Sequence, residues 1–219
     1  MLKRRVFITG GTGYVGRALV EKLLGRGHEV RALVRRGSEG KLAAGAEAVT
    51  GDPLDESSFA GRVAPSDTFV QLVGVAHPSP AKAKEFREID LVSGRASVGA
   101  ARAAGVRHFV YVSVAQPAPV MRDYQAVRAE VEAILRESGL PATILRPWYV
   151  LGPGHRWPYA LIPFYWVMER LPSKRETALR LGLVTREQMI AALVRAVEEP
   201  SNDFRVVNVP EIKAMNAAR

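Results

Sequence analysis

Residues 6–16 read VFITGGTGYVG, a short apolar run that ends in a glycine-rich turn. Apolar residues at helical spacing follow over positions 17–26, so this stretch predicts a strand, a tight turn and a helix. Gly10 can adopt backbone angles that a side chain disfavours, Gly13 lets the backbone approach a phosphate, and Gly16 lets the helix pack close to the strand. The first N–H groups of the helix would then face an anion. We therefore predict a pyrophosphate-binding turn; the alternative is an ordinary glycine-rich connection.

The chain has 219 residues, no cysteine and a net charge of +9. This length fits a single domain, 1–219, and the absence of cysteine excludes disulfides and thiol chemistry. Lys and Arg are spread along the sequence, with no aromatic-basic strand face or recognition helix, so nucleic-acid binding is the least favoured class. The first apolar run is too short for a signal peptide or a membrane span, which favours the cytoplasm. We expect no bound metal, and nothing indicates an oligomeric state.

The second predicted strand, residues 28–34, is followed by Arg35 and Arg36. In dinucleotide-binding folds an acidic residue at this place usually binds the ribose 2′-hydroxyl of NAD. A 2′-phosphate would repel a carboxylate and pair with a guanidinium. The two arginines therefore favour NADP over NAD, unless they only decorate a loop.

Further strands are predicted at residues 46–50, 67–75, 106–113, 141–147 and 204–209, and helices at 82–104, 120–138 and 185–198. This alternation predicts an α/β fold, a Rossmann-like doubly wound parallel sheet with helices on both faces. Ligands bind such sheets at the carboxyl ends of the strands. The predicted strand ends hold Gly10, Arg35, Asp52, Gly74, Ser113 and Pro147.

Asp52 is expected to accept a hydrogen bond from an adenine amino group, while Asp55 caps the helical turn that follows; the alternative for Asp52 is capping as well. Gly74 would leave room for a ribose. The predicted cofactor contacts are Gly10, Thr12, Gly13, Tyr14, Val15, Gly16, Arg35, Arg36, Asp52, Pro53, Val73, Gly74, Val75 and Pro147.

The chain resembles the short-chain dehydrogenase/reductase superfamily, especially its atypical and extended NAD(P)-binding branches, which include the NmrA-like proteins. The resemblance rests on residues 9–16 (TGGTGYVG), 51–52 (GD), 110–113 (VYVS) and 145–154 (LRPWYVLGPG), in the family's order. It covers most of residues 3–155. It implies a sheet of about seven parallel strands and a small C-terminal region, residues 153–219, that closes over the substrate.

In that family a Ser orients the substrate oxygen, and a Tyr exchanges a proton with it. A Lys four residues after the Tyr lowers the Tyr pKa and binds the nicotinamide ribose. Ser113 matches the Ser and Tyr124 the Tyr, whereas the fourth residue on is Arg128. An arginine stays charged and would still lower the pKa of Tyr124, but its planar fork is not equivalent to an ammonium. These three are the candidate catalytic residues; the alternative is an ordinary Tyr–Arg pair facing a cleft.

Residues 155–172 read HRWPYALIPFYWVMERLP, with five aromatic residues from Trp157 to Trp166. Three interpretations stay open: a helix that covers the core, a lid over an apolar substrate, and a peripheral membrane contact. In the lid interpretation, Trp157, Phe164 and Trp166 border an apolar cavity. His155 is a candidate proton donor, although a single His after a Gly-Pro-Gly turn is more often structural.

The sequence as a whole favours an NADP-preferring oxidoreductase that acts on an apolar carbonyl, an alcohol or a quinone-like small molecule. The alternative is an NAD(P)-binding redox sensor or assembly factor with little or no turnover. The replaced Lys and the short spacing between Ser113 and Tyr124 motivate that alternative.

Overall fold

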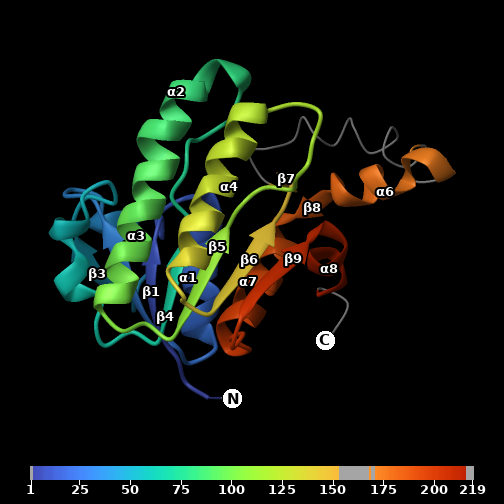
Figure 1. Ribbon diagram of the computed structural model, residues 1–219. Helices are drawn as coiled ribbons and strands as arrows, with labels where there is room; N and C mark the ends of the chain where they lie inside the picture. The colour runs from blue at the N-terminus through green and yellow to red at the C-terminus, as the bar shows by residue number, and fades with distance from the viewer. Residues whose placement is uncertain (1, 153–167, 169–170, 216–219) are drawn as a thin grey trace.

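The computed structural model describes residues 2–152, 168 and 171–215 (Figure 1). Its main sheet has seven strands in the order β3-β2-β1-β4-β5-β6-β9, and every neighbouring pair is parallel. The predicted Rossmann-like fold is therefore confirmed. The strands are β1 (Arg5–Thr9), β2 (Glu29–Val34), β3 (Glu47–Thr50), β4 (Thr68–Gln71), β5 (His108–Val112), β6 (Ala142–Arg146) and β9 (Phe204–Asn208).

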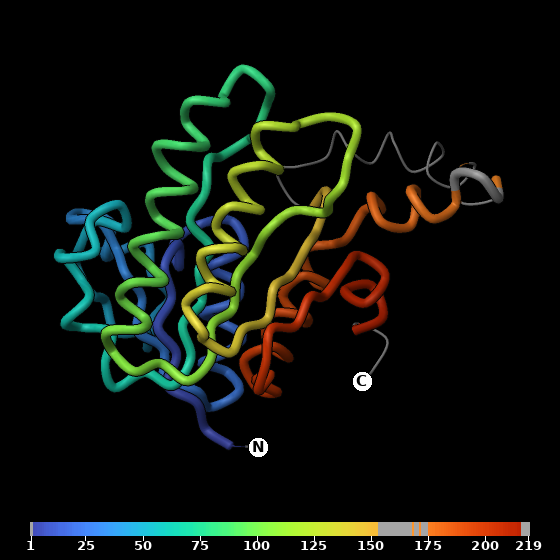
Figure 2. Tube along the Cα trace, viewed as in Figure 1, coloured from blue at the N-terminus to red at the C-terminus, as the bar shows by residue number. Residues whose placement is uncertain are grey.

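Helices cover both faces of this sheet, as Figures 1 and 2 show. The helices are α1 (Tyr14–Gly25), α2 (Ala83–Glu85), α3 (Val92–Ala103), α4 (Arg122–Glu137), α6 (Pro172–Arg180), α7 (Arg186–Glu198) and α8 (Val209–Ala214). Helices α3 and α4 lie on one face, and α1 packs beside α7 on the other. A separate parallel pair, β7 (Tyr149–Leu151) and β8 (Leu183–Thr185), lies outside the main sheet.

Strand β1 shows how the sequence divides the core between these faces. Successive side chains of a strand point to opposite sides of the sheet. Val6 and Ile8 accordingly pack with α1 and α7, and Phe7 packs with α3 and α4. All three are fully buried, which explains why this strand reads as a continuous apolar run.

Three phenylalanines fix the register of the central strands. Phe7, Phe69 and Phe109 are direct partners on β1, β4 and β5. The ring centroids of Phe7 and Phe69 lie 5.2 Å apart, and those of Phe69 and Phe109 lie 5.1 Å apart. A slip of one residue would turn these rings to the other face, so the stack specifies the pairing.

Several predicted helix ends are confirmed. Gly105 and Gly139 follow α3 and α4 with φ of +66° and +72°, the left-handed conformation that glycine allows. The hydroxyl of Thr185 accepts the N–H of Gln188, and the Gln188 side chain accepts the N–H of Thr185, so a capping box marks the start of the helix predicted at 185.

One predicted boundary is wrong, and one predicted helix contains an irregular turn. The strand expected over 67–75 ends at Gln71, because side chains bind the backbone of the residues that follow. The helix expected over 82–104 contains a π-helical turn, η5 (Phe86–Leu91), between α2 and α3. Such turns are rare in proteins as a whole, and those that do occur often lie at functional sites.

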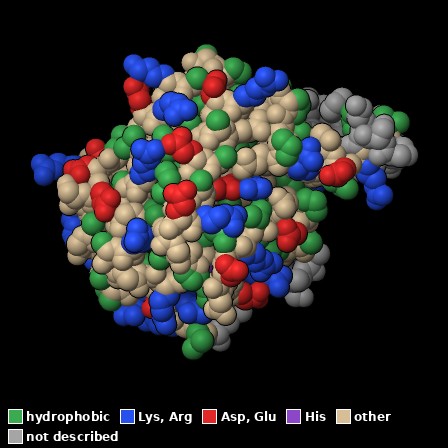
Figure 3. Space-filling view, in the orientation of Figure 1, with side chains coloured by type: hydrophobic (Ala, Val, Ile, Leu, Met, Phe, Trp, Pro, Cys, Tyr) green, Lys and Arg blue, Asp and Glu red, His purple; other side chains and the backbone are tan. Residues whose placement is uncertain are grey.

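The C-terminal region is described in part. Strand β9 joins the edge of the main sheet beside β6, as the sequence allowed. The interpretations of 155–172 depend on residues that lie mostly outside the described ones, and His155, Trp157, Phe164 and Trp166 all lie outside them. Across the part that the structure describes, no helix is long and apolar enough to cross a membrane. Figure 3 shows basic side chains distributed among acidic ones on the visible face.

Burial of His108 makes the stability of the fold depend on pH. Its side chain lies in the sheet with Nε2 3.0 Å from the Thr143 hydroxyl, and burial lowers its pKa to about 4. The unfolded chain, with a histidine pKa of about 6.5, binds more protons between these values, so stability falls as the pH drops through this window. We expect the free energy of unfolding to be about 2 kcal/mol lower at pH 5 than at pH 7.

Urea unfolding at both pH values measures this difference, and His108→Gln, which keeps a partner for Thr143, should remove most of it. The carboxylate of Asp67 has a pKa of about 2, so the stability that it contributes to the fold is lost only below about pH 4, outside this range. An equal pH dependence in both proteins would contradict the assignment to His108.

Candidate functional site

A cleft of about 450 Å³ lies at the carboxyl ends of β1, β2 and β4. Four loops that are distant in sequence form its walls, as a doubly wound sheet requires. The predicted cofactor residues that line it are Gly10, Thr12, Gly13, Arg35, Asp52, Pro53, Val73, Gly74 and Val75. Most of the predicted cofactor site is thus brought together.

The other predicted cofactor residues do not line this cleft. Tyr14, Val15 and Gly16 belong to the first turn of α1. Arg36 lies on the same loop as Arg35 but outside the cleft wall. Pro147 uses its carbonyl to accept the N–H of Ala115, 2.8 Å away.

The glycine turn fits a pyrophosphate. Gly10 has a φ of +79°, and a Cβ there would lie 2.9 Å from the backbone carbon of Leu72. A Cβ on Gly16 would overlap the carbonyl oxygen of Gly10, so α1 approaches the turn as closely as a backbone can. Helix α1 begins after Gly13 with no side-chain cap and no acidic residue in its first turn. Its first N–H groups and the positive end of its dipole can therefore receive an anion.

The end of β2 and the loop after it form a second wall of the cleft, which includes Arg35. It follows β2 directly, and its carbonyl accepts the N–H of Ser38, 2.9 Å away, which closes a turn with Gly37 at a φ of +81°. This turn places Ser38 beside Arg35 in the cleft wall. Sequence reasoning missed Ser38; a Gly-Ser pair after the strand was the available signal.

Asp52 contributes its side chain to the wall and also shapes its own loop. Its Oδ1 accepts the N–H of Leu54 at 2.9 Å, and its N–H donates to the Ser58 hydroxyl at 2.9 Å. Asp55 accepts the N–H of Ser57 at 3.0 Å, so its predicted capping role is confirmed.

The loop after β4 forms a third wall, residues 72–76. Gly74 was predicted to leave room for a ribose. Instead, a Cβ on Gly74 would overlap Nη2 of Arg128, so the guanidinium fills the space where its side chain would be. Two further residues reach this part of the cleft and were missed: Lys82, whose Nζ donates to the carbonyl of Ala76 at 2.7 Å, and Glu85.

Ser113 is buried at the carboxyl end of β5. Its hydroxyl donates to Oε1 of Glu132, 2.5 Å away, and that carboxylate also binds Arg146 and the amide of Gln116. The hydroxyl is therefore part of a buried polar cluster. No hydrogen bond joins it to Tyr124 among the described contacts.

Tyr124 packs its ring against Phe86, with centroids 4.9 Å apart, and the Arg128 guanidinium lies 5.0 Å from the ring. Burial raises the pKa of Tyr124, and the nearby Arg128 charge opposes this only in part. Arg128 thus acts on this pKa in the expected direction, but burial outweighs it and the net pKa lies above the usual value. Arg128 donates to Asp90, to the Val112 carbonyl and to the Tyr111 hydroxyl, so most of its donors face the protein.

No group of three or more His, Asp or Glu side chains suited to a metal occurs within the described part of the chain. The polar groups of the cleft include a helix N-terminus, the hydroxyls of Thr12 and Ser38, the cations of Arg35 and Lys82, and two carboxylates. This donor set suits a phosphorylated nucleotide. The fold and the cleft together define a Rossmann-type nucleotide-binding protein.

Comparison with known proteins identifies the family. The model of the NAD(P)H-binding family matches residues 10–200, so the chain belongs to this family. The NAD(P)-binding family that the sequence resembles is therefore confirmed, and a solved structure of a short-chain dehydrogenase/reductase superfamily protein shares its fold. The solved structure of the enzyme WbmH from Bordetella bronchiseptica, in complex with NAD+, superposes with a TM-score of 0.70. It covers 94% of this chain and 76% of WbmH at 22% identity, which shows a shared fold.

Curated relatives differ in what they do. A ceramide reductase from Caulobacter vibrioides (strain NA1000 / CB15N) is 29% identical over 197 residues, covering 89% of this chain and 61% of the reductase. The photosystem II assembly factor Ycf39 from Trieres chinensis is 28% identical over 144 residues, covering 64% of this chain and 44% of that protein. The chain spans less than two thirds of the length of these relatives.

The glycine turn gives a direct test of the cleft. Gly13 has a φ of −77°, which alanine also adopts, and an added Cβ would lie 3.2 Å from the Gly10 carbonyl oxygen, a contact that a small shift relieves. We expect Gly13→Ala to stay folded but to weaken NAD(P)H binding about tenfold or more, because the methyl group displaces a phosphate from the helix N-terminus.

Gly25→Ala is the matched control, since a Cβ at this end of the same helix meets no atom within 4 Å. Calorimetry with NADPH and a thermal melt should separate the two variants. Unchanged affinity in folded Gly13→Ala would remove the pyrophosphate assignment.

Proposed function

We propose that this protein is an NADP-preferring oxidoreductase of the short-chain type that reduces an apolar carbonyl or quinone-like small molecule. The observation that carries the proposal is the single cleft into which the glycine turn, Arg35 and the loop after β4 converge. The similarity to a ceramide reductase supports the same class of chemistry.

The preference for NADP rests on the end of β2. Arg35 and Ser38 line the cleft together, and no acidic residue follows the strand there. A guanidinium and a hydroxyl are suitable donors for a 2′-phosphate. Arg36 is outside the wall, so Arg35 alone carries the charge that we assign to this contact.

Reduction of a carbonyl requires a hydride and a proton. A reduced nicotinamide, when bound, would supply the hydride. The proton would go to the carbonyl oxygen, and a tyrosine, which is protonated at neutral pH, can donate it. We assign Tyr124 as the proton donor.

Ser113 is assigned to orient the substrate oxygen, which requires its hydroxyl to turn away from Glu132. Arg128 is bound to Asp90 and to two oxygens of β5, so we assign it no contact with substrate. The C-terminal region, residues 153–219, is proposed to cover an apolar substrate, with residues 155–172 as lid or peripheral membrane contact. We place the protein in the cytoplasm on the sequence alone.

A second candidate function is NAD(P) binding without turnover, as in a redox sensor or an assembly factor. The engagement of Ser113 by Glu132 and of Arg128 by Asp90 favours it, because both candidate catalytic groups already have partners. The similarity to an assembly factor points the same way.

Turnover separates the two functions. We expect NADPH oxidation with a panel of long-chain ketones and quinones, and we expect Tyr124→Phe to lower kcat by about 10²–10⁴ while leaving NADPH affinity within about twofold, since only the donated proton is lost. Fluorescence titration measures the affinity. Cofactor binding with no oxidation of NADPH on any member of the panel would favour the second function.

Cofactor choice tests Arg35 against its neighbour. A charge-assisted hydrogen bond contributes about 1.5–3 kcal/mol, so Arg35→Ala should weaken NADPH binding by about tenfold to a hundredfold and leave NADH nearly unchanged. Added salt should weaken NADPH binding more than NADH binding in the wild type. Arg36→Ala is the control and should change neither affinity. Equal losses for the two cofactors, or a wild-type preference for NADH, would contradict the assignment.

A further inference from the structure

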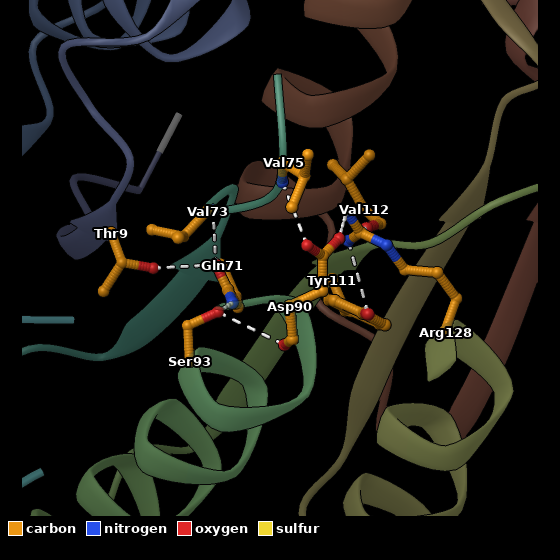
Figure 4. Close-up of polar contacts among 9 residues, drawn as sticks. All are labelled: Thr9, Gln71, Val73, Val75, Asp90, Ser93, Tyr111, Val112 and Arg128. Atoms are coloured by element: carbon orange, nitrogen blue, oxygen red, sulfur yellow. Dashed lines mark hydrogen bonds and ion pairs between the residues drawn. The ribbon is translucent and has the colours of Figure 1, made fainter. Parts of the chain in front are cut away.

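The loop after β4, residues 72–76, forms a wall of the cleft without regular secondary structure, and we call it the cofactor loop. Buried side chains hold its backbone from behind (Figure 4). The N–H of Val73 donates to Oε1 of Gln71 at 2.6 Å, and the N–H of Val75 donates to Oδ2 of Asp90 at 2.9 Å. The shape of this wall therefore depends on two side-chain acceptors.

Gln71, the last residue of β4, is itself fixed on both sides. Thr9 donates its hydroxyl to Oε1 at 3.0 Å, and Nε2 donates to the Ser93 hydroxyl at 3.2 Å. Ser93 in turn donates to the backbone carbonyl of Asp90, 3.2 Å away. Since all of these side chains are buried, rotating the amide would leave unpaired polar groups. The network thus links β1, β4 and α3 to the cofactor loop.

Asp90 comes from the π-helical turn η5 and has a fully buried carboxylate. Its Oδ1 accepts from Nη2 of Arg128 at 2.5 Å. Arg128 also donates to the Val112 carbonyl at 2.9 Å and to the Tyr111 hydroxyl at 3.3 Å. Burying two charges is costly unless both are paired and hydrogen-bonded, and here each charge has several partners. Removing one of them would leave the other without its counter-charge.

The ion pair also touches the loop directly. A Cβ on Gly74 would overlap Nη2 of Arg128 and lie 3.1 Å from Oδ1 of Asp90. The guanidinium therefore packs against the loop backbone, while Asp90 binds the N–H of the next residue, Val75. Glycine at 74 and the ion pair behind it fit together as one unit.

We propose that Asp90, Arg128 and Gln71 are positioning residues that fix the cofactor loop, so that Arg128 acts on the bound nucleotide through the loop. This rests on a nucleotide occupying the cleft and does not depend on turnover. It differs from a role on Tyr124, because that role would change kcat and leave cofactor affinity alone.

Arg128→Met tests the proposal. We expect it to weaken NADPH and NADH binding alike, by about tenfold or more, because the loop wall is common to both cofactors. Loss of the 2′-phosphate contact would affect NADPH alone. Amide hydrogen exchange should also become faster at Val75, which loses a fixed acceptor. Arg128→Lys keeps the charge and should recover part of the affinity.

Gln71→Leu is an independent variant, which leaves the buried charges intact and removes the acceptor of Val73. It should weaken both cofactors and speed exchange at Val73. Asp67→Asn is the matched control, because Asp67 binds Arg5 and Arg107 at the opposite end of the same strand. It should lower the melting temperature without a change in cofactor affinity.

Unchanged affinity in folded Arg128→Met and Gln71→Leu would overturn the proposal, as would an Asp67→Asn variant that loses affinity to the same degree. A lower kcat in Arg128→Met with unchanged cofactor affinity would contradict the proposal too, because it would assign Arg128 a role on Tyr124 and not on the loop. Wild-type protein that binds cofactor without oxidising it would contradict the proposed function alone, because affinity and amide exchange still report on the loop.

Discussion

The contact between α1 and the turn after β1 is the constraint on which the nucleotide cleft depends. A side chain at Gly16 would overlap the carbonyl oxygen of Gly10, so no other residue allows the helix to start so close to the strand. This approach aims the helix N-terminus at the carboxyl end of the sheet, where the loops after β2, β3 and β4 also meet. The cleft is therefore a consequence of backbone packing, and its side chains select among the nucleotides that the backbone admits.

Helix α4 carries two charged residues, Arg128 and Glu132, that form ion pairs with other elements. Tyr124, Arg128 and Glu132 are spaced by four residues, so they lie on one face of the helix. Arg128 pairs with Asp90 of η5, and Glu132 pairs with Arg146 at the end of β6. Such buried pairs contribute little net stability but are costly to break, which makes them suited to holding one geometry. Arg128, one helical turn after Tyr124, therefore holds Asp90 and the neighbouring backbone in one geometry.

The relatives indicate why the pairing of Arg128 with Asp90 matters for function. This chain is similar both to a ceramide reductase and to an assembly factor, so membership of the family does not by itself distinguish turnover from binding. Here Ser113 and Arg128 both have buried partners, and desolvation raises the pKa of Tyr124, which is partly buried.

The sequence by itself determined the order of strands and helices, the glycine turn, the caps at Gly105, Gly139 and Thr185, and most of the cleft wall. These follow from local periodicity and backbone freedom, which neighbouring residues specify. Only the tertiary structure decided the end of β4, the π-helical turn and the partners of Ser113 and Arg128. Asp90 and Arg128 are 38 residues apart, and Ser113 and Glu132 are 19 apart. Burial and pairing across such distances set both hydrogen bonds and the pKa of Tyr124, because desolvation depends on what packs around a group and not on its neighbours in sequence.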